Sequence, residues 1–342
     1  MKDNQQTHTW VEEIQENAQV TGLYLAKVKR TAVTRKGDPY LTITLGDRTG
    51  EVEARVWDRV EIFSSLFKEG DILDILGHAS TYRNRIQLTL TDLKVAEDVG
   101  DPSLFLESTA HDVGEMLGAL RTIFKEMHDG PLKELVNRFL SDRQFISLFK
   151  KAPAAKNFHH NYIGGLLEHT LSVCQMSLNL SRHYGQLDGD LLVTGAFLHD
   201  IGKVQELKYD HQIDYTDEGR LLGHLVLGVG MVEEKVLGMD AFPREQDNLV
   251  KHLILSHHGQ FEFGSPKRPK FLEAFALHLI DDMDAKMNGL GRFMAHDRQD
   301  GAWTDFNRLF ERYFLKRKVT SAGGEEKAET SPEDRQGALF SQ

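Results

Sequence analysis

The second half of the chain holds histidine and aspartate residues whose side chains could bind metal ions. Imidazole nitrogens and carboxylate oxygens suit Mn, Fe, Co, Ni or Zn ions in a mixed nitrogen and oxygen site. Asp200 directly follows His199, and its two carboxylate oxygens can bridge two ions. The candidate ligands are His169, His199, Asp200, His224, His257, His258 and Asp281. The sequence therefore predicts a metal centre that can activate water for hydrolysis.

The elements that must hold these ligands are helices. Apolar residues recur at helical spacing from Leu117 to Met127 and from Leu132 to Leu140, and Gly130-Pro131 separates the two runs. The His-Asp pair lies in the apolar run GAFLHDIGK, which is also helical in character. We expect an all-α domain over residues 108–318, with helices that continue to about Lys318.

The first hundred residues have a different pattern of apolar and polar residues, which predicts a small all-β barrel. Five short runs alternate between apolar and polar residues, and a turn is expected at Asp47-Arg48-Thr49-Gly50. The expected strands are Gln19–Arg30, Tyr40–Leu45, Val52–Trp57, Asp71–Leu76 and Arg85–Leu93. A short helix over Val60–Lys68 separates the third strand from the fourth. Three strands, a helix and two strands is the order of an oligonucleotide-binding (OB) barrel, which leaves no open edges.

The charge balance supports a nucleic-acid-binding role for this barrel. Residues 18–96 carry 12 Lys and Arg against 10 Asp and Glu, a charge of +2. Because the whole chain has a net charge of −11, the remaining residues carry −13. That overall charge argues against a broad basic face for duplex nucleic acid. Candidate phosphate contacts are Lys27, Lys29, Arg30, Arg35, Lys36, Arg83 and Arg85. Candidate stacking platforms for bases are Tyr40, Trp57 and Tyr82, whose alternative role is in the barrel core.

Composition sets the class of protein and the domain boundaries. A single cysteine, Cys174, excludes a disulfide framework within one chain and a cysteine-based zinc site. The N-terminus lacks the apolar core of a secretory signal, and no apolar run is long enough to span a bilayer, so we expect a cytoplasmic protein without a membrane partner. The expected parts are an N-terminal tail with a short helix over 1–17, the barrel over 18–97, a linker over 98–107, the helical domain over 108–318, and a disordered tail over 319–342.

The ordered set of histidines and aspartates resembles the HD-domain metal-dependent phosphohydrolase superfamily, whose two-metal members follow the pattern H…HD…H…H…D. The resemblance implies a first ion held by His169, His199, Asp200 and Asp281. It implies a second ion held by Asp200, His224 and His257, with His258 as a replacement or support for His257. Some three-metal relatives carry a glutamate one turn before the first histidine, but position 165 is Gly. We therefore expect two metal ions.

Two further positions are expected to act with Asp200 in catalysis by in-line attack on phosphorus. Lys203 lies four residues after His199, on the same helical face, and its ammonium can neutralise a phosphate oxygen. It could equally be an ordinary surface lysine. His159 and His160, in NFHHNYIGGLLEHT, either contact a phosphate or leaving group or cap the next helix. We predict that His160 stabilises developing charge.

The combination of barrel and HD-type helices resembles the YhaM-type 3′→5′ exoribonuclease family over about residues 18–318. The resemblance rests on YLTITLGDRTGEVEARVWD in the barrel and on HHNYIGGLLEHTLSV, FLHDIGKVQEL, GHLVLG, LSHHGQFEFGSPKRPK and ALHLIDDMDAKM in the helices. It implies manganese-type metals, single-stranded RNA or DNA as substrate, release of 5′-mononucleotides, and homo-oligomers. The loop over residues 259–270, with Lys267, Arg268 and Lys270, either guides the strand or is an ordinary solvated loop.

Two other functions are compatible with the same residues. One is an HD phosphohydrolase of free or cyclic nucleotides, in which the barrel only regulates. The other is a nucleic-acid-binding or assembly protein with a vestigial metal site. The complete ligand set argues against the vestigial site, and the barrel favours the exonuclease because a small nucleotide needs no extended groove.

Overall fold

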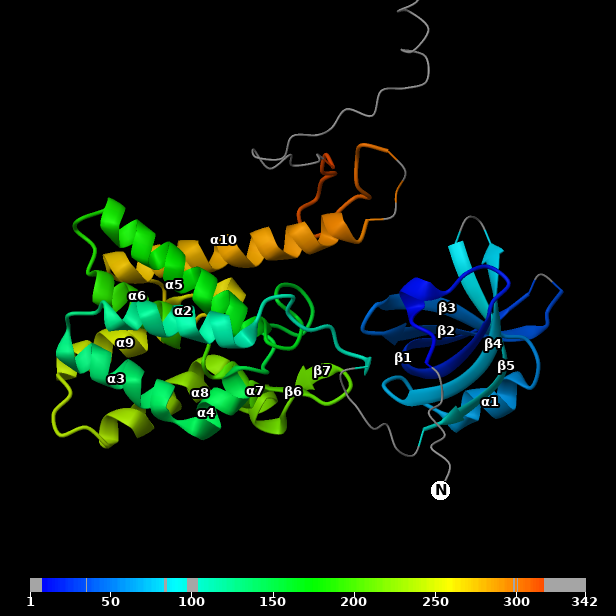
Figure 1. The fold of residues 1–342 in the computed structure, drawn as a ribbon, viewed down its shortest axis with the longest axis horizontal. Coiled ribbons are helices and arrows are strands. Elements are labelled where there is room, and N and C mark those ends of the chain that lie inside the picture. The colour runs from blue at the N-terminus through cyan, green and yellow to red at the C-terminus, as the bar shows by residue number, and fades with distance from the viewer. Residues whose placement is uncertain are drawn as a thin grey trace, which may run out of the picture. The chain divides into compact units, whose positions relative to one another are not determined.

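The computed structural model describes residues 8–34, 36–82, 85–96, 104–297, 299 and 301–316. The chain divides into two compact units, Met1–Gly289 and Leu290–Gln342. The first unit contains a β-barrel, drawn in blue and cyan in Figure 1, and a helical domain, drawn in colours from teal through green and yellow to orange. This organisation confirms a multidomain chain with a small all-β barrel of OB strand order followed by a helical domain.

The barrel has the predicted order of elements. Its strands and helix are β1 (Gln19–Val33), β2 (Pro39–Asp47), β3 (Gly50–Val56), α1 (Val60–Leu66), β4 (Ile72–Tyr82) and β5 (Arg85–Val95). They close in the order β1-β2-β3-β5-β4, with β3 and β5 parallel and the other described pairs antiparallel. Alternating residues such as Leu41, Ile43 and Leu45 are fully buried, which explains why this register is specified.

The predicted turn between β2 and β3 forms because Asp47 bonds to the backbone beyond it. Its Oδ1 accepts hydrogen bonds from the amides of Thr49 at 2.7 Å and Gly50 at 3.2 Å. Its Oδ2 accepts from the amide of Val11 at 2.8 Å, which begins a 3₁₀ helix over Val11–Glu13. The short helix expected in the N-terminal segment is therefore a single turn attached to the barrel.

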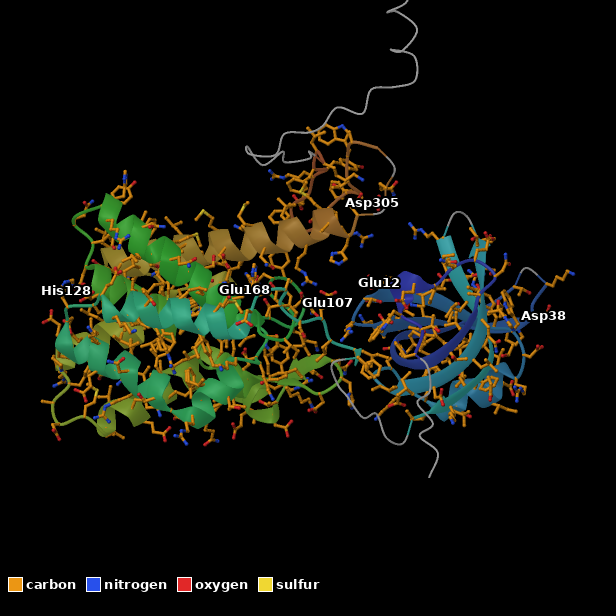
Figure 2. All side chains as sticks on the ribbon, viewed as in Figure 1. Glu12, Asp38, Glu107, His128, Glu168 and Asp305 are labelled. Atoms are coloured by element: carbon orange, nitrogen blue, oxygen red, sulfur yellow. The ribbon has the colours of Figure 1, made fainter. Side chains whose placement is uncertain are left out.

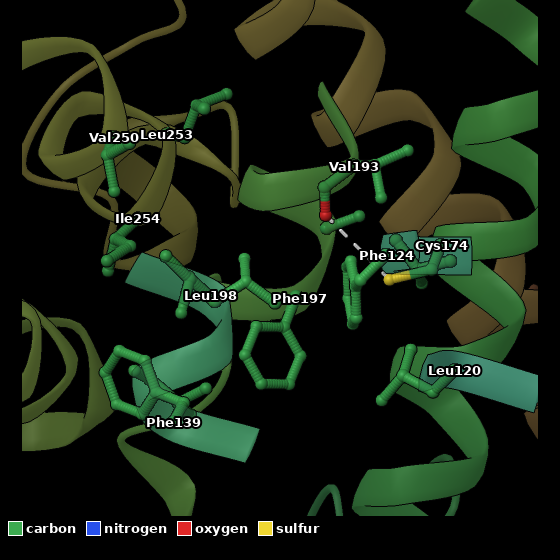
Figure 3. Close-up of a cluster of buried hydrophobic side chains, with 14 of the residues drawn as sticks. Leu120, Phe124, Phe139, Cys174, Val193, Phe197, Leu198, Val250, Leu253 and Ile254 are labelled. Carbon is green, nitrogen blue, oxygen red and sulfur yellow. Dashed lines mark hydrogen bonds between the residues drawn. The ribbon is translucent and has the colours of Figure 1, made fainter. Parts of the chain in front are cut away.

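The helical domain surrounds one apolar core. Its helices are α2 (Val113–Lys125), α3 (Gly130–Ser141), α4 (Arg143–Phe149), α5 (Gly165–His183), α6 (Gly189–Leu198), α7 (Lys203–Glu206), α8 (Asp217–Leu237), α9 (Arg244–Ser256) and α10 (Leu272–Ala295). Phe197 of α6 lies at the centre of the core, with edge-to-face contacts to Phe124 and Phe139 (Figure 3). Every residue of α6 from Leu191 to Leu198 is buried, so the His-Asp pair follows a helix enclosed on all sides.

Two features of this region differ from the sequence prediction. A two-stranded sheet of β6 (Leu207–Tyr209) and β7 (Ile213–Tyr215) interrupts the helices. The expectation that helices continue to about Lys318 is wrong, because α10 ends at Ala295 and the described residues of 301–316 form turns and isolated bridges. The polar run HDRQDG over residues 296–301 offers no apolar face to continue a helix.

In the described part of the chain, no helix combines the length and hydropathy needed to cross a membrane.

Candidate metal centre

The HD pair is placed by the turn between α6 and α7. His199 caps the C-terminus of α6, Asp200 follows, and Lys203 opens α7. Gly202 in this turn lies against α8, where a Cβ atom would be 2.1 Å from the carbonyl oxygen of His224. Glycine is therefore required for the backbone that carries Asp200 to approach the helix that carries His224.

The first group of candidate ligands comes from α5, the end of α6 and α10. The Nε2 atom of His169 lies 3.2 Å from Nε2 of His199 and 3.2 Å from Oδ1 of Asp281. Oδ2 of Asp200 lies 3.6 Å from Nε2 of His169 and 3.4 Å from Nε2 of His199. These separations suit four ligands around one ion, because metal–ligand distances of about 2.0–2.2 Å put neighbouring ligand atoms roughly 3 Å apart.

The second group shares Asp200. Its Oδ1 atom lies 3.5 Å from Nε2 of His224 and 3.6 Å from Nε2 of His257. His224, His257 and His258 each offer a ring nitrogen, and the three nitrogens lie within 4.8 Å of one another. The structure thus brings both His257 and His258 to this group, where the sequence left the choice between them open.

The outer ring nitrogens of these histidines are oriented by hydrogen bonds. Nδ1 of His199 donates to the carbonyl oxygen of Ala196 at 2.8 Å, and Nδ1 of His257 donates to the carbonyl oxygen of Ile254 at 2.8 Å. Nδ1 of His224 donates to Oε1 of Glu206 at 3.0 Å. Because carbonyl and carboxylate oxygens only accept, the proton is on Nδ1, and each Nε2 directs its lone pair to the centre.

The residues present fit a pair of divalent cations. Oδ1 of Asp200 and Nε2 of His224 are buried and have no hydrogen-bond partner within the described residues. Buried polar atoms are nearly always paired, so two such atoms that face each other require an explanation. Lone pairs that converge with carboxylate oxygens are satisfied by a cation, and imidazole with carboxylate suits a divalent metal.

Charge within the centre shifts the pKa values of the ligands. Burial alone would raise the pKa of Asp281, but hydrogen bonding to His169 and nearby imidazole charge hold it well below its usual range. Burial would lower the pKa of His169, yet Asp281 and Asp284 on either side raise it to about 9. A divalent cation would compete with that proton for Nε2 of His169, so metal binding would release the proton.

Lys203 and the His159-His160 pair lie around the centre in different ways. Nζ of Lys203 is 2.6 Å from Oδ2 of Asp200, and the lysine is buried rather than on the surface. His160 is 3% exposed, and both of its ring nitrogens are engaged, with Tyr162 Oη at 2.9 Å and Asp284 Oδ2 at 3.0 Å. The ring of His160 therefore contacts the same oxygen of Asp284 that bonds Nδ1 of His169, on the side of His169 away from its Nε2.

His159, in contrast, keeps a ring nitrogen available. Its ring centroid is 5.5 Å from that of His169, and its Nδ1 has no hydrogen-bond partner in the described segments. Burial, followed by the positive charge of Lys203, lowers its pKa to about 3, so the imidazole is neutral. Of the two adjacent histidines, His159 is the one with a free donor or acceptor near the centre.

Sequence reasoning missed the carboxylates that support the ligands. Asp284 accepts from Nδ1 of His169 at 2.7 Å and from the hydroxyl of Ser172, and Glu206 holds His224. Glu168, labelled on α5 in Figure 2, accepts from the hydroxyl of Tyr162 at 2.8 Å. The spacing of Asp281 and Asp284 at i and i+3 places both on one helical face, a signal that could have identified Asp284.

The candidate stacking residues gather on the barrel surface. The rings of Tyr40 and Trp57 are stacked with centroids 4.9 Å apart, and Trp57 and Tyr82 are exposed rather than part of the barrel core. The guanidinium of Arg55 lies 5.6–5.8 Å from the centroids of all three rings. Arg55 was not among the predicted contacts, although the strand alternation of VEARVW puts it on the same face as Trp57.

The basic candidates divide into engaged and exposed side chains. Lys27 pairs with Glu51 at 2.9 Å, and Nζ of Lys29 bonds the carbonyls of Ser64 and Phe67 at the end of α1, which gives Lys29 a structural role. The exposed candidates are Arg30, Lys36, Arg85, Lys267 and Arg268. Arg35 and Arg83 lie outside the described residues.

Comparison with known protein families agrees with this division of the chain. The HD domain family matches residues 166–286, and an OB-fold nucleic acid binding domain family matches residues 24–96. A putative helicase family also matches residues 125–187. Among solved structures, the second OB-fold domain of replication protein A from Methanococcus maripaludis is similar, with 18% identity, a TM-score of 0.23, and coverage of 28% of this chain and 100% of that chain.

Two curated relatives match most of the chain. The 3′-5′ exoribonuclease YhaM of Halalkalibacterium halodurans is 36% identical over 273 residues, which cover 79% of this chain and 84% of the relative. The 3′-5′ exoribonuclease YhaM of Bacillus velezensis is 35% identical over 273 residues, which cover 79% and 85%. Identity of this extent across both chains leads to one conclusion: the protein belongs to the YhaM 3′-5′ exoribonuclease family.

Proposed function

We propose that this protein is a metal-dependent 3′→5′ exonuclease that hydrolyses the phosphodiester bonds of single-stranded RNA to 5′-mononucleotides and also accepts single-stranded DNA. The observation that carries the proposal is the 36% identity to a 3′-5′ exoribonuclease over 84% of that relative's length. The convergence of four Nε2 atoms on the carboxylates of Asp200 and Asp281 supports hydrolytic chemistry at a metal centre.

Two divalent ions, manganese in the first instance and Fe, Co, Ni or Zn as alternatives, match the two ligand groups. The first would be held by His169, His199, Asp200 and Asp281. The second would be held by Asp200, His224, His257 and His258. Such ions, when bound, polarise phosphoryl oxygens and lower the pKa of water.

The chain's own groups account for the remaining needs of phosphodiester hydrolysis. Lys203, held 2.6 Å from Asp200, supplies positive charge for the phosphoryl oxygens. His159 offers a neutral imidazole for a hydrogen bond at the phosphate or the leaving oxygen. His160, which the sequence suggested for this role, instead positions Asp284 and through it the ring of His169.

The barrel supplies contacts for the rest of the strand. Exposed Trp57 and Tyr82, with Tyr40 stacked on Trp57, offer ring faces to bases, and Arg55 adds positive charge between them. Exposed Lys36 and Arg85 would contact phosphates. This arrangement favours an extended single strand over a free nucleotide as the substrate.

Location and assembly complete the proposal. The only cysteine, Cys174, is buried and free, which suits the reducing conditions of the cytoplasm. A homo-oligomer is supported by an exposed apolar stripe on α10, formed by Leu272, Phe275, Leu279, Met283 and Met287.

Purified protein, Mn²⁺ and 5′-labelled single-stranded RNA test the function. The expected product is a ladder that descends from full length, because nucleotides leave the unlabelled 3′ end. Immediate release of a labelled mononucleotide would show that cleavage starts at the 5′ end and would contradict the proposed 3′→5′ direction. Intact RNA together with hydrolysis of cyclic nucleotides would favour the small-nucleotide phosphohydrolase. Asp281→Ala should be inactive in the same assay.

A further inference from the structure

The loop that follows α9 begins at the second ligand group, directly after His258, and carries two exposed phenylalanine side chains. Phe261 and Phe263 are 57% and 68% exposed and form the ends of a 3₁₀ turn. Two large rings only two residues apart make an apolar surface that water solvates poorly. Such a surface next to a reaction centre is a candidate for contact with the substrate.

A direct hydrogen bond connects this loop to the metal centre. Nδ1 of His258 donates to the carbonyl oxygen of Phe263 at 2.9 Å, and the amide of Gln260 donates to the carbonyl of His258 at 2.9 Å. The other nitrogen of His258 belongs to the group with His224 and His257. The ring of a candidate ligand, His258, is therefore hydrogen-bonded directly to the backbone of Phe263.

The loop is held in shape by bonds back to α9. The buried hydroxyl of Ser265 lies 3.0 Å from the carbonyl oxygen of Leu255 and 2.8 Å from that of Lys267. Gly259 has φ of 78°, and a Cβ atom there would be 2.2 Å from the ring of His278. A loop already fixed in one shape loses little conformational entropy when a ligand binds to it.

Positive charge accompanies the rings. The guanidinium of Arg268 lies 4.9 Å from the ring centroid of Phe261, and Lys267 and Lys270 are on the same loop. Aromatic faces combined with basic side chains are the usual means of holding single-stranded nucleic acid. A phenyl ring cannot donate or accept conventional hydrogen bonds, so a site of this composition stacks any base without selecting among them.

We propose that Phe261 and Phe263 form a stacking subsite for the nucleobases at the reacting end of the strand, with Arg268 held against Phe261 to face the adjoining phosphate. This subsite rests on the proposed nuclease function and adds to it a second nucleic-acid contact, separate from the barrel aromatics. Stacking beside the centre positions the terminal phosphodiester with respect to the ligands, because base and phosphate belong to the same nucleotide.

A comparison of normal and abasic substrates tests the subsite. Two single-stranded oligonucleotides of equal length are used, one with all its bases and one with abasic residues at its last two 3′ positions. Stacking is worth about 1–3 kcal/mol per base, so the loss of two stacks in Phe261→Ala combined with Phe263→Ala should lower kcat/KM by about 30-fold or more on the normal strand. The abasic strand, a poorer substrate for the native protein, should be degraded equally by the native protein and by the variant.

Control variants separate stacking from structural effects. Phe263→Trp keeps a ring face and should retain most of the activity, with circular dichroism and metal content unchanged in every variant. Tyr184→Ala removes another exposed aromatic, fifteen residues beyond His169 and so about 22 Å along the axis of α5, and should leave both substrates unaffected.

The outcomes distinguish the subsite from the nuclease function. Unchanged activity of the double variant on the normal strand, or an equal loss on both strands, would overturn the subsite and leave the exonuclease intact. If the native protein with Mn²⁺ removes no nucleotide from either strand, the exonuclease function fails, and the subsite fails with it.

Discussion

At the scale of single residues, Asp200 is the group on which both ligand sets depend. Its Oδ2 faces His169 and His199, while its Oδ1 faces His224 and His257. Asp200→Ala should therefore lose both ions and all activity, whereas His224→Ala should lose mainly the second ion. Elemental analysis of the purified variants decides this, and full metal occupancy in Asp200→Ala would contradict the bridging role. Both variants should stay folded, because the large apolar core contains no metal ligand.

Lys203 provides a second test at this scale. Its ammonium is paired with Asp200 but is not part of either ligand group. Lys203→Ala should retain both metals and lose on the order of 10²-fold in rate, with the effect in kcat more than in KM. Steady-state kinetics with a metal analysis of the same sample checks this. An unchanged kcat would leave Lys203 with no role in the transition state.

Asp284 tests the support behind a ligand. It accepts from His169, His160 and Ser172, and so fixes the ring of His169. Asp284→Asn should weaken metal binding by about 10- to 100-fold, as loss of an outer carboxylate does in other metal sites. Titration of the metal-free protein with Mn²⁺ measures this, and excess Mn²⁺ should restore much of the activity. Asp282→Asn, two residues away, changes a carboxylate whose side chain is 45% exposed and pairs with Lys286. It is the matched control and should bind metal normally.

At the scale of elements, the junction of α3 and α4 shows how caps stabilise the helices around the centre. Asp142 accepts from the amides of Gln144 and Phe145, and its Oδ2 is 2.6 Å from Nζ of Lys235 in α8. Asp142→Ala should cost about 1 kcal/mol of stability, which is a decrease of roughly 2–4 °C in Tm for a domain of this size. Asp142→Asn retains a capping side chain and should cost less.

The pH dependence of that difference follows from the pKa of Asp142. Hydrogen bonding to Lys235 and then to the amide of Phe145 lowers this pKa. A carboxylate with a lowered pKa stabilises the fold above its ordinary pKa of about 3.9, and the contribution is lost as the pH falls towards the lowered value. The Tm difference between native protein and Asp142→Ala should be full at neutral pH and should narrow below about pH 4. A constant difference at all pH values would show that the charge of Asp142 does not contribute.

At the scale of the whole molecule, the barrel and the helical domain have separate apolar cores, one built around Tyr24 and Leu41 and the other around Phe124 and Phe197. Deletion of residues 1–100 should thus leave a folded helical part. KM for long single strands should rise by one or more orders of magnitude, because each lost base stack is worth about 1–3 kcal/mol. Hydrolysis of bis(p-nitrophenyl) phosphate should change little.

Salt provides the second measurement for the truncated protein. Activity of the intact protein on long RNA should fall with added salt through counterion release, and activity of the truncated protein should fall less. Circular dichroism confirms that the truncation is folded. Equal degradation of long RNA by both forms would mean that the barrel does not hold the strand, and would favour the small-nucleotide phosphohydrolase.

Much of this protein could be predicted from local patterns. Strand alternation and turn residues are set within a few positions, so the order of the barrel strands and the turn at Asp47 were predictable. Ligand chemistry is a property of residue type, so the set from His169 to Asp281 could be selected without coordinates. Both kinds of information depend on neighbours close in sequence.

Only the tertiary structure decided how these groups face one another. Sequence order does not say which nitrogen of a histidine turns inwards, because the group that bonds the other nitrogen is distant in sequence, as Asp284 is from His169. The same reason explains why the sequence did not show that the ring nitrogens of His160 contact Tyr162 and Asp284. It also explains why the sequence left open the choice between His257 and His258, which both lie in the second group. The end of α10 was also mispredicted. The sequence prediction extended the helices to about Lys318, but α10 ends at Ala295 because the polar run that follows has no apolar face to pack against the core.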